Sequence, residues 1–296
     1  GIPVPQFFEG MELVIWSFHV ALFLFLSGYL LTYNTRPAGS YICRRGVRLL
    51  VPYFVLSVIA FVPKALVQQF LNDSVEFSAW YLIKTELIPR ENVWGHFWYI
   101  PVVFALCCFG VLMLKTMRSR RATGWVLLAA TYLLLFVPQT TDWFALEDLR
   151  KTSFYFVLGM VLAIRDPEAF VVSNRCWLLA FPAALVLFRT INTTLTNSII
   201  ACLMIGFVLH VGTWLPFYKI NLFAAIEKNS FTIFLLSWPA QAVVEVVCNK
   251  LLHFPVLLTM GMMFLAGITV PLVCVKIVSL IDKRISMKWV KLAIGM

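Results

Sequence analysis

His19 lies inside the first long apolar stretch of the chain, in the segment WSFHVALFLFLSGYLL at residues 16–31. Because a helix rises 1.5 Å per residue, His19 lies about 12 Å along a helix that begins near residue 11. An ionisable side chain so deep in an apolar segment is costly to keep and is often functional. A neutral imidazole can take a proton from an alcohol near neutral pH. His19 is therefore a candidate catalytic base; the alternative is a neutral histidine that hydrogen-bonds across a helix interface.

Three arginines, Arg44, Arg45 and Arg48, directly precede or open the second apolar stretch. On a helix, residues 44 and 48 share one face, and guanidinium groups bind phosphate or pyrophosphate through paired hydrogen bonds. The alternative is the ordinary enrichment of basic residues at the cytoplasmic ends of membrane helices. The same two interpretations apply to a second basic cluster, which comprises Lys115, Arg118, Arg120 and Arg121.

His96 opens the third apolar stretch and is surrounded by Trp94, Trp98 and Tyr99. Aromatic rings can stack on the face of a sugar, so His96 and Trp98 are candidate residues for binding a sugar. The alternative is the belt of aromatic side chains that marks a membrane–water interface. His210 and Glu245 lie in later apolar stretches, where we expect each to pair across a helix bundle; a functional role is the alternative.

The common catalytic templates of soluble enzymes are absent from the sequence. It contains no HxxxxD acyltransferase box, phosphate-binding loop, GxSxG elbow or zinc-ligand spacing. The seven cysteines lie within or beside apolar stretches and form no CxxC pair, so we expect free thiols, no disulfide framework and no metal site.

The elements that position these residues must be membrane helices. The chain has 296 residues, of which 61% are hydrophobic and 13% charged, and its mean hydropathy is +0.88. Soluble domains are about half apolar and a quarter charged, so a soluble globular protein is excluded. At about 20 residues per crossing, the length allows roughly eight to ten transmembrane helices and no separate soluble domain. We therefore predict an all-α, polytopic helical bundle that forms a single transmembrane domain over residues 1–296.

Nine apolar stretches of spanning length are bounded by charged or turn-forming residues. They cover residues 11–33, 48–67, 97–114, 123–138, 149–164, 176–190, 198–216, 230–248 and 255–275. The connectors on one side, with the C-terminal tail, carry 17 basic residues, and the other side carries 7. This asymmetry predicts a cytoplasmic C-terminus and places residue 1 outside. An outer start without a signal sequence suggests that a preceding helix is missing.

The net charge of +10 arises from 24 Lys and Arg against 14 Asp and Glu. Because most of the basic residues lie in short connectors between apolar stretches, this charge indicates topology, and no nucleic-acid partner is expected.

Four segments together resemble the integral-membrane acyltransferases of the acyltransferase 3 family, in matching order and spacing over about residues 11–250. The segment SFHVALFLFLSGYLL (17–31) is similar to the family's FHxPLFFFxSGYLL helix, with Ala21 where proline is usual. The segment RRGVRLLVPY (44–53) is similar to its arginine-rich stretch that ends in Pro-Tyr. HFWYIPVVF (96–104) resembles its HLWFLPALF element, and NSFTIFLLSWP (229–239) resembles its late NSLxIYLLHxP helix.

The sequence departs from the family pattern in two further places. The family normally starts with another helix that carries an R-x-x-A…H pattern, and this chain begins after its expected position. Either the sequence is truncated and a tenth helix precedes residue 1, or this member works without that helix. The late helix has Ser237 where the family often has histidine. These departures leave His19 as the histidine that lies within a matched motif at membrane depth.

The resemblance implies an enzyme, a membrane acyltransferase that moves an acyl group from cytoplasmic acyl-CoA to a hydroxyl of an extracytoplasmic carbohydrate or glycolipid. The expected reaction is O-acetylation, with acetyl-CoA as donor substrate and no bound cofactor. Arg44, Arg45 and Arg48 would hold the nucleotide phosphates at the inner mouth of a polar passage, and His19 would act nearer the outer face. The expected location is a bacterial inner membrane.

Two other functions remain open. A transporter or flippase of a polar or lipid-linked substrate would also have many helices and few buried charges, although the sequence shows no internal repeat. A catalytically silent relative that keeps the scaffold is the other alternative.

Overall fold

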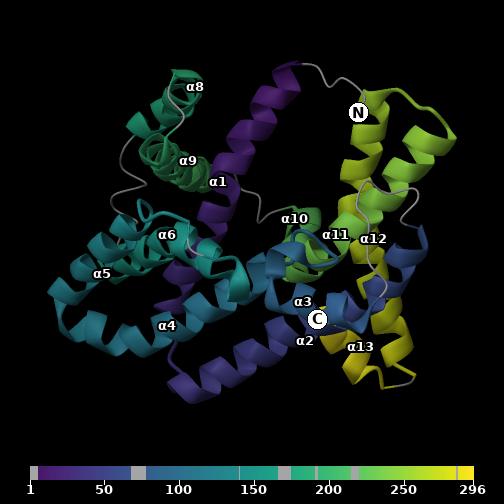
Figure 1. Cartoon of the computed structure of the whole chain (residues 1–296), viewed down its shortest axis with the longest axis horizontal. Helices are drawn as coiled ribbons and strands as arrows, with labels where there is room; N and C mark the ends of the chain where they lie inside the picture. The colour runs from purple at the N-terminus through teal and green to yellow at the C-terminus, as the bar shows by residue number, and fades with distance from the viewer. Residues whose placement is uncertain are drawn as a thin grey trace. The chain divides into compact units, whose positions relative to one another are not determined.

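The computed structural model describes residues 6–67, 78–139, 141–165, 175–190, 193–214, 220–284 and 286–296. Within these ranges the backbone forms helices joined by turns and short connectors (Figure 1). The chain divides into two compact units. The α1/α6 unit comprises residues 4–45 and 101–215, and the α11/α12 unit comprises residues 1–3, 46–100 and 216–296.

The α1/α6 unit contains most of the first half of the chain. Its helices are α1 (Gln6–Leu31), most of α4 (Tyr99–Ser119), α5 (Arg121–Leu134), the short η3 (Trp143–Ala145), α6 (Leu146–Ile164), η4 (Arg175–Leu179), α8 (Ala180–Thr190) and α9 (Thr194–Trp214). Helix α1 packs against α6 and α9, and its core contacts include Phe25, Phe154 and Ile205. This core holds the helix that carries His19.

Two glycines allow α1 and α6 to approach closely. A Cβ atom on Gly28 would lie 2.0 Å from the carbonyl oxygen of Phe156, and one on Gly159 would lie 2.1 Å from that of Phe25. Neither position has room for a side chain, because the obstacle is backbone. The Ser27-Gly28 pair in the first motif therefore serves helix packing at Gly28, as small residues do between membrane helices.

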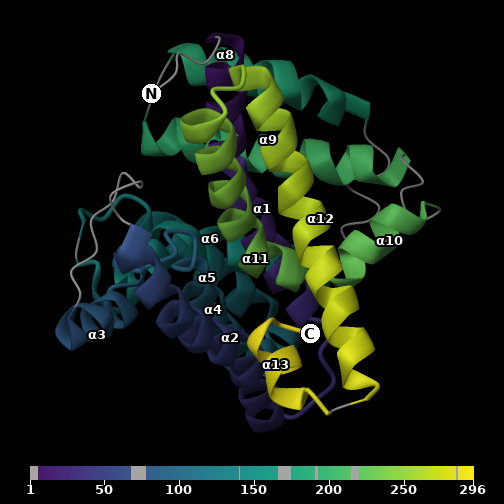
Figure 2. The same cartoon turned by 90° about the vertical axis from the view of Figure 1, so that its right-hand side faces the viewer.

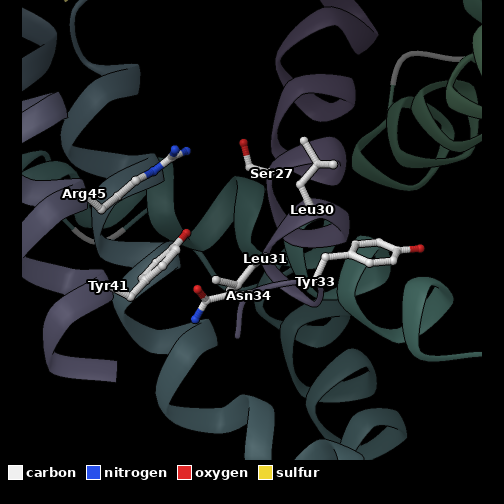
Figure 3. Close-up of a pocket in the computed structure, with 7 residues that line it drawn as sticks. All are labelled: Ser27, Leu30, Leu31, Tyr33, Asn34, Tyr41 and Arg45. Carbon is white, nitrogen blue, oxygen red and sulfur yellow. The ribbon is translucent and has the colours of Figure 1, made fainter. Parts of the chain in front are cut away.

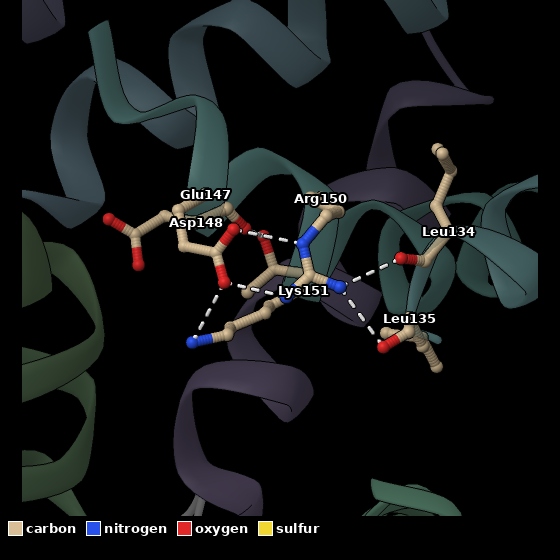
Figure 4. A network of polar contacts seen from close by, with 7 residues as sticks. Leu134, Leu135, Glu147, Asp148, Arg150 and Lys151 are labelled. Atoms are coloured by element: carbon tan, nitrogen blue, oxygen red, sulfur yellow. Dashed lines mark hydrogen bonds and ion pairs between the residues drawn. The ribbon is translucent and has the colours of Figure 1, made fainter. Parts of the chain in front are cut away.

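Arg150 joins the end of α5 to the start of α6. Its guanidinium donates to the side chain of Glu147 at 2.9 and 2.6 Å and to the carbonyl oxygens of Leu134 and Leu135 at 2.9 and 3.0 Å (Figure 4). Lys151 adds an ion pair to Glu147 at 3.1 Å. These bonds satisfy carbonyls that the end of a helix leaves without partners, so this group of ionisable residues is accounted for structurally.

The α11/α12 unit contains the remaining helices. They are the larger part of α2 (Ala38–Val67), α3 (Ala79–Leu87), η2 (Pro89–Glu91), α10 (Asn221–Lys228), α11 (Ser230–Glu245), the π-helical η6 (Val246–Leu251), α12 (Val256–Asp282) and α13 (Lys288–Ala293). Helices α11 and α12 run side by side (Figures 1 and 2). Most large apolar side chains of α12 are exposed, as expected of a helix that faces lipid.

Each of the nine predicted apolar stretches overlaps at least one helix, so the all-α prediction is confirmed for the described part of the chain. Four helical segments there are long and apolar enough to cross a membrane: Tyr99–Ser119, Thr194–Trp214, Ser230–Asn249 and Val256–Asp282. Three shorter apolar helical segments cover Ile15–Leu31, Ala122–Leu134 and Arg175–Leu187. All seven cysteines lie in the described ranges and are free.

Candidate active site

An open cavity of about 280 Å³ lies between the end of α1 and the first turns of α2, within the α1/α6 unit. It is lined by Ser27, Leu30, Leu31, Tyr33, Asn34, Tyr41 and Arg45. Figure 3 shows the guanidinium of Arg45 and the phenol of Tyr41 extending from α2 toward the end of α1. Hydroxyl, amide and guanidinium groups therefore share one hollow, which we call the Arg45 cavity.

Arg45 is the charged group of this cavity. Its side chain is half-buried, and its buried Nε has no hydrogen-bond partner among the described residues. Leaving a buried donor of a charged group unsatisfied is costly. An anion in the cavity would remove that cost, and phosphate suits the fork of a guanidinium.

The other two arginines of the motif lie elsewhere on α2. Arg44 and Arg48 are exposed, and their four-residue spacing puts them on one helix face as predicted. Arg48 already interacts with other groups of the chain. Of the three predicted phosphate-binding residues, the structure thus places one, Arg45, in the lining of the cavity.

His19 lies on α1 with a partly buried ring. Its Nδ1 lies 2.9 Å from the carbonyl oxygen of Ile15, and the ring meets that of Trp16 edge-on at 5.1 Å between centroids. A carbonyl oxygen can only accept, so Nδ1 must carry the proton in this bond. In the neutral imidazole, Nε2 then keeps a free lone pair, which is the arrangement a general base requires.

His19 does not line the Arg45 cavity. It precedes Ser27 by eight residues, which corresponds to about 12 Å along α1. A continuous polar passage between the two positions stays a prediction.

His96 and Trp98 lie in the turn that precedes α4, in the α11/α12 unit. The imidazole of His96 meets the rings of Phe97 at 4.9 Å and Phe234 at 5.2 Å. Neither ring nitrogen makes a hydrogen bond of normal geometry within the described part of the chain. Burial lowers the pKa of His96 to about 4, with the backbone of Phe234 opposing the shift. The guanidinium of Arg90 lies 3.9 Å from the centroid of the Trp98 ring.

A buried polar cluster, which the sequence did not predict, holds this turn. The Nδ2 of Asn92 donates to the Oγ of Ser57 at 2.9 Å, and its Oδ1 accepts from the backbone N–H of Trp94 at 3.0 Å. Longer contacts reach the hydroxyl of Tyr53 at 3.4 Å and the carboxylate of Glu86 at 3.5 Å. We call these residues, Tyr53, Ser57, Glu86 and Asn92, the Asn92 cluster. It connects the Pro-Tyr end of the arginine motif to the turn that carries His96.

Glu86 lies on α3, outside the predicted spans, and is the ionisable carboxyl of the cluster. Burial raises its pKa to about 7, and hydrogen bonds from Ser57, Tyr53 and Asn92 oppose the shift. Its buried Oε2 has no hydrogen-bond partner among the described residues.

Three other residues that the sequence singled out, Arg118, His210 and Glu245, lie outside the Arg45 cavity and the Asn92 cluster. Arg118, from the second basic cluster, donates to the carbonyl oxygen of Thr32 at the end of α1. His210 is buried in α9 and meets Trp214 at 4.9 Å between ring centroids, and Glu245 is exposed at the end of α11.

Three polar residues that line the cavity, Tyr33, Asn34 and Tyr41, were not predicted from the sequence. Tyr41 precedes Arg45 by four residues, so helical spacing alone places both on one face. Asn34 follows the end of the first apolar helix, a position that periodicity does not describe.

Comparison with known proteins identifies the family of this chain. An acyltransferase domain family, acyltransferase 3, matches residues 2–278. No curated protein and no solved structure matches the chain. Apolar helices that suit a bilayer and a family match over nearly the whole length agree with each other. The chain belongs to the acyltransferase 3 family of membrane acyltransferases.

Proposed function

We propose that this protein is an O-acetyltransferase that takes the acetyl group from cytoplasmic acetyl-CoA and transfers it to a hydroxyl of an extracytoplasmic carbohydrate or glycolipid. The observation that carries the proposal is the Arg45 cavity, where a half-buried guanidinium with an unpartnered Nε lines an open polar hollow. Phosphate groups of CoA are the anions that such a site would accept. Arg44 and Arg48 add positive charge on the exposed face of the same helix.

The separation between Arg45 and His19 suits this substrate. In acyl-CoA the phosphates and the thioester lie at opposite ends of the long pantetheine arm. Phosphates at the Arg45 cavity would leave that arm to extend along α1, over the distance of about 12 Å that separates Ser27 from His19. His19 would then lie near the thioester.

The chemical step uses the free Nε2 of His19. Nε2 takes the proton of the acceptor hydroxyl while the oxygen attacks the thioester carbonyl. A C–O bond forms, the C–S bond breaks, and the CoA thiolate leaves and takes up a proton. The bond between Nδ1 and the Ile15 carbonyl keeps the imidazole in the required tautomer.

The turn with His96 and Trp98 would bind the acceptor. The pKa of His96, near 4, keeps its imidazole neutral at physiological pH. Both of its ring nitrogens are buried without a hydrogen-bond partner among the described residues, so an acceptor that displaced the covering groups would find one donor and one acceptor there. Trp98 offers a ring on which a sugar can stack.

The proposed topology has nine crossings and a cytoplasmic C-terminus, and the proposed location is a bacterial inner membrane. The asymmetry of basic residues between alternate connectors supports the orientation.

The test is acetyl-CoA consumption and acetyl transfer by the purified chain in proteoliposomes, with bacterial envelope glycans as acceptors. We expect His19→Ala to lower turnover by about 100- to 10,000-fold, with an unchanged gel-filtration profile. His253→Ala is the matched control, because His253 is exposed in a loop. Full turnover by His19→Ala would refute the role of His19. Substrate movement without acetyl-CoA consumption would favour a transporter, and inactivity in both assays a silent relative.

A further inference from the structure

The chain folds back on itself directly after α12. The Oδ1 of Asp282, the last residue of α12, accepts from the backbone N–H of Met287 at 2.8 Å, and its other oxygen pairs with the ammonium of Lys291. This pair spans the turn between α12 and α13 and sets the direction in which α13 leaves.

The end of the segment is anchored to α11. Gly295 is buried at a φ of +79°, and a Cβ atom there would lie 2.5 Å from Phe231 and 2.9 Å from Leu235. A residue with a side chain would be strained and would clash at this position. The fold-back is therefore a packed structure that fixes which side of α13 faces outward.

The fold-back exposes three cations and one aromatic ring close together in the sequence. Lys283, Arg284, Lys288 and Trp289 are all exposed, and we call these four residues the basic–tryptophan face. Trp289 is 81% exposed, more than any other large hydrophobic side chain described. Because Asp282 and Lys291 pair with each other, the face keeps a net charge of +3.

The position of this face, directly after α12, indicates the kind of partner that it binds. It begins at the residue that follows α12, one of the helices long and apolar enough to span a bilayer, so the nearest extended surface is that of the membrane. Tryptophan favours the interface between headgroups and hydrocarbon, and basic residues next to a membrane helix are attracted to anionic lipids.

We propose that the basic–tryptophan face binds anionic phospholipid headgroups in the leaflet where α12 ends, with the Trp289 ring inserted among them. The three cations contact lipid phosphates. The inserted Trp289 ring contributes apolar binding that does not depend on charge. The face therefore has an electrostatic component and an apolar component, which can be tested separately. An acidic soluble protein would satisfy the cations but would leave Trp289 without an apolar medium.

The test measures the environment of Trp289 in the full chain, reconstituted in phosphatidylcholine vesicles with or without phosphatidylglycerol. The chain has ten tryptophans, so the Trp289 signal is the difference between the chain and its Trp289→Phe variant. With phosphatidylglycerol present, we expect this signal to be quenched by lipids with brominated acyl chains and shielded from aqueous acrylamide. High salt should reverse part of the quenching.

A charge variant separates the two components. The triple variant Lys283→Gln, Arg284→Gln and Lys288→Gln should weaken the phosphatidylglycerol dependence by about a hundredfold, since each basic residue contributes roughly fivefold. The matched control removes three exposed cations elsewhere, Lys115, Arg120 and Lys228, and should leave the Trp289 signal unchanged. Equal quenching of Trp289 in both vesicle types, continued access to acrylamide, or an unchanged lipid dependence of the triple variant would overturn the proposal.

Discussion

The Arg45 cavity and the Asn92 cluster both gather polar side chains at apolar helices, yet they differ in how those groups are satisfied. Arg45 lines the cavity, and its buried Nε has no hydrogen-bond partner among the described residues. In the cluster, Asn92 is only 4% exposed, and its amide nitrogen and oxygen are both hydrogen-bonded. An unsatisfied group beside open space suits a ligand, whereas a satisfied buried group fixes the backbone around it.

Glu86 is the exception within the Asn92 cluster. One of its oxygens is contacted by Asn92 at 3.5 Å, while Oε2 has no partner in the described residues. The raised pKa of its carboxyl, about 7, means that the folded cluster favours a proton there. Ligand binding is therefore expected at Arg45, a contribution to stability at Asn92, and pH-dependent stability at Glu86.

The largest expected effect is at Arg45. Arg45→Gln should raise the KM for acyl-CoA by about 100-fold, because a hydrogen bond to a charged group contributes about 1.5–3 kcal/mol. Thermal stability should stay within about 0.5 kcal/mol of that of the unaltered chain, since the Nε of Arg45 forms no bond that is lost. Initial-rate kinetics and thermal unfolding in detergent measure the two effects.

Arg44→Gln is the matched control for this variant. It removes the same charge from the adjacent, exposed position, so screening by solvent should limit its effect on KM to a few-fold. Equal effects of the two variants would mean that general positive charge, and not the cavity, attracts the donor.

A loss of stability is expected at Asn92. Asn92→Ala removes the bonds to Ser57 and to the backbone N–H of Trp94, which then lies without a partner. We expect the free energy of unfolding to fall by about 2 kcal/mol, measured by thermal unfolding. Asn221→Ala, at an exposed position on α10, should change it little, and an unaltered stability of Asn92→Ala would show that the cluster does not hold the turn.

Glu86 should make stability depend on pH. Its pKa is raised in the folded protein from the usual 4.5 to about 7, so the folded state binds a proton that the unfolded state has lost between these values. Stability should therefore fall as pH rises from about 4.5 to about 7 and stay level above that. The fall should be about 2 kcal/mol at most, because the carboxyl is partly exposed.

Glu86→Gln keeps the shape and removes the titration. Thermal unfolding between pH 4.5 and 8 should show a shallower slope for this variant than for the unaltered chain. If the two slopes agree, Glu86 titrates normally and the cluster is wetter than the structure indicates.

The sequence predicts the helices well and their packing poorly. Apolar length alone locates the stretches that become helices, because a backbone in lipid must satisfy its own hydrogen bonds. The extension of α12 seven residues beyond 275, and the start of α2 at Ala38, were not predicted, since helices continue into polar residues after the apolar run has ended. The contact between Gly28 and Phe156 depends on a second helix, which no local pattern specifies.

The site shows the same limit. Arginine chemistry predicted Arg45 together with Arg44 and Arg48, and helical spacing would have added Tyr41. That Arg45 enters a cavity while Arg44 and Arg48 are exposed depends on the position of α1, which residue type does not reveal. Asn92 was missed because a buried amide in a turn becomes recognisable only through its partners on α2 and α3.

The smallest expected effect is at Tyr53, and it sharpens the distinction between short and long bonds within the cluster. Its hydroxyl lies 3.4 Å from the Nδ2 of Asn92 and 3.5 Å from the carbonyl oxygen of Glu86, both near the limit of a hydrogen bond. Tyr53→Phe keeps the buried ring and its contact with Phe97 and should cost about 0.5 kcal/mol. Ser57→Ala is the comparison variant, because it removes the 2.9 Å bond to Asn92 and should cost about 1 kcal/mol or more. If Tyr53→Phe proves the more costly of the two in thermal unfolding, then the hydroxyl at the end of the Pro-Tyr motif contributes more than its distances imply, and Tyr53 rather than Asn92 is the centre of the cluster.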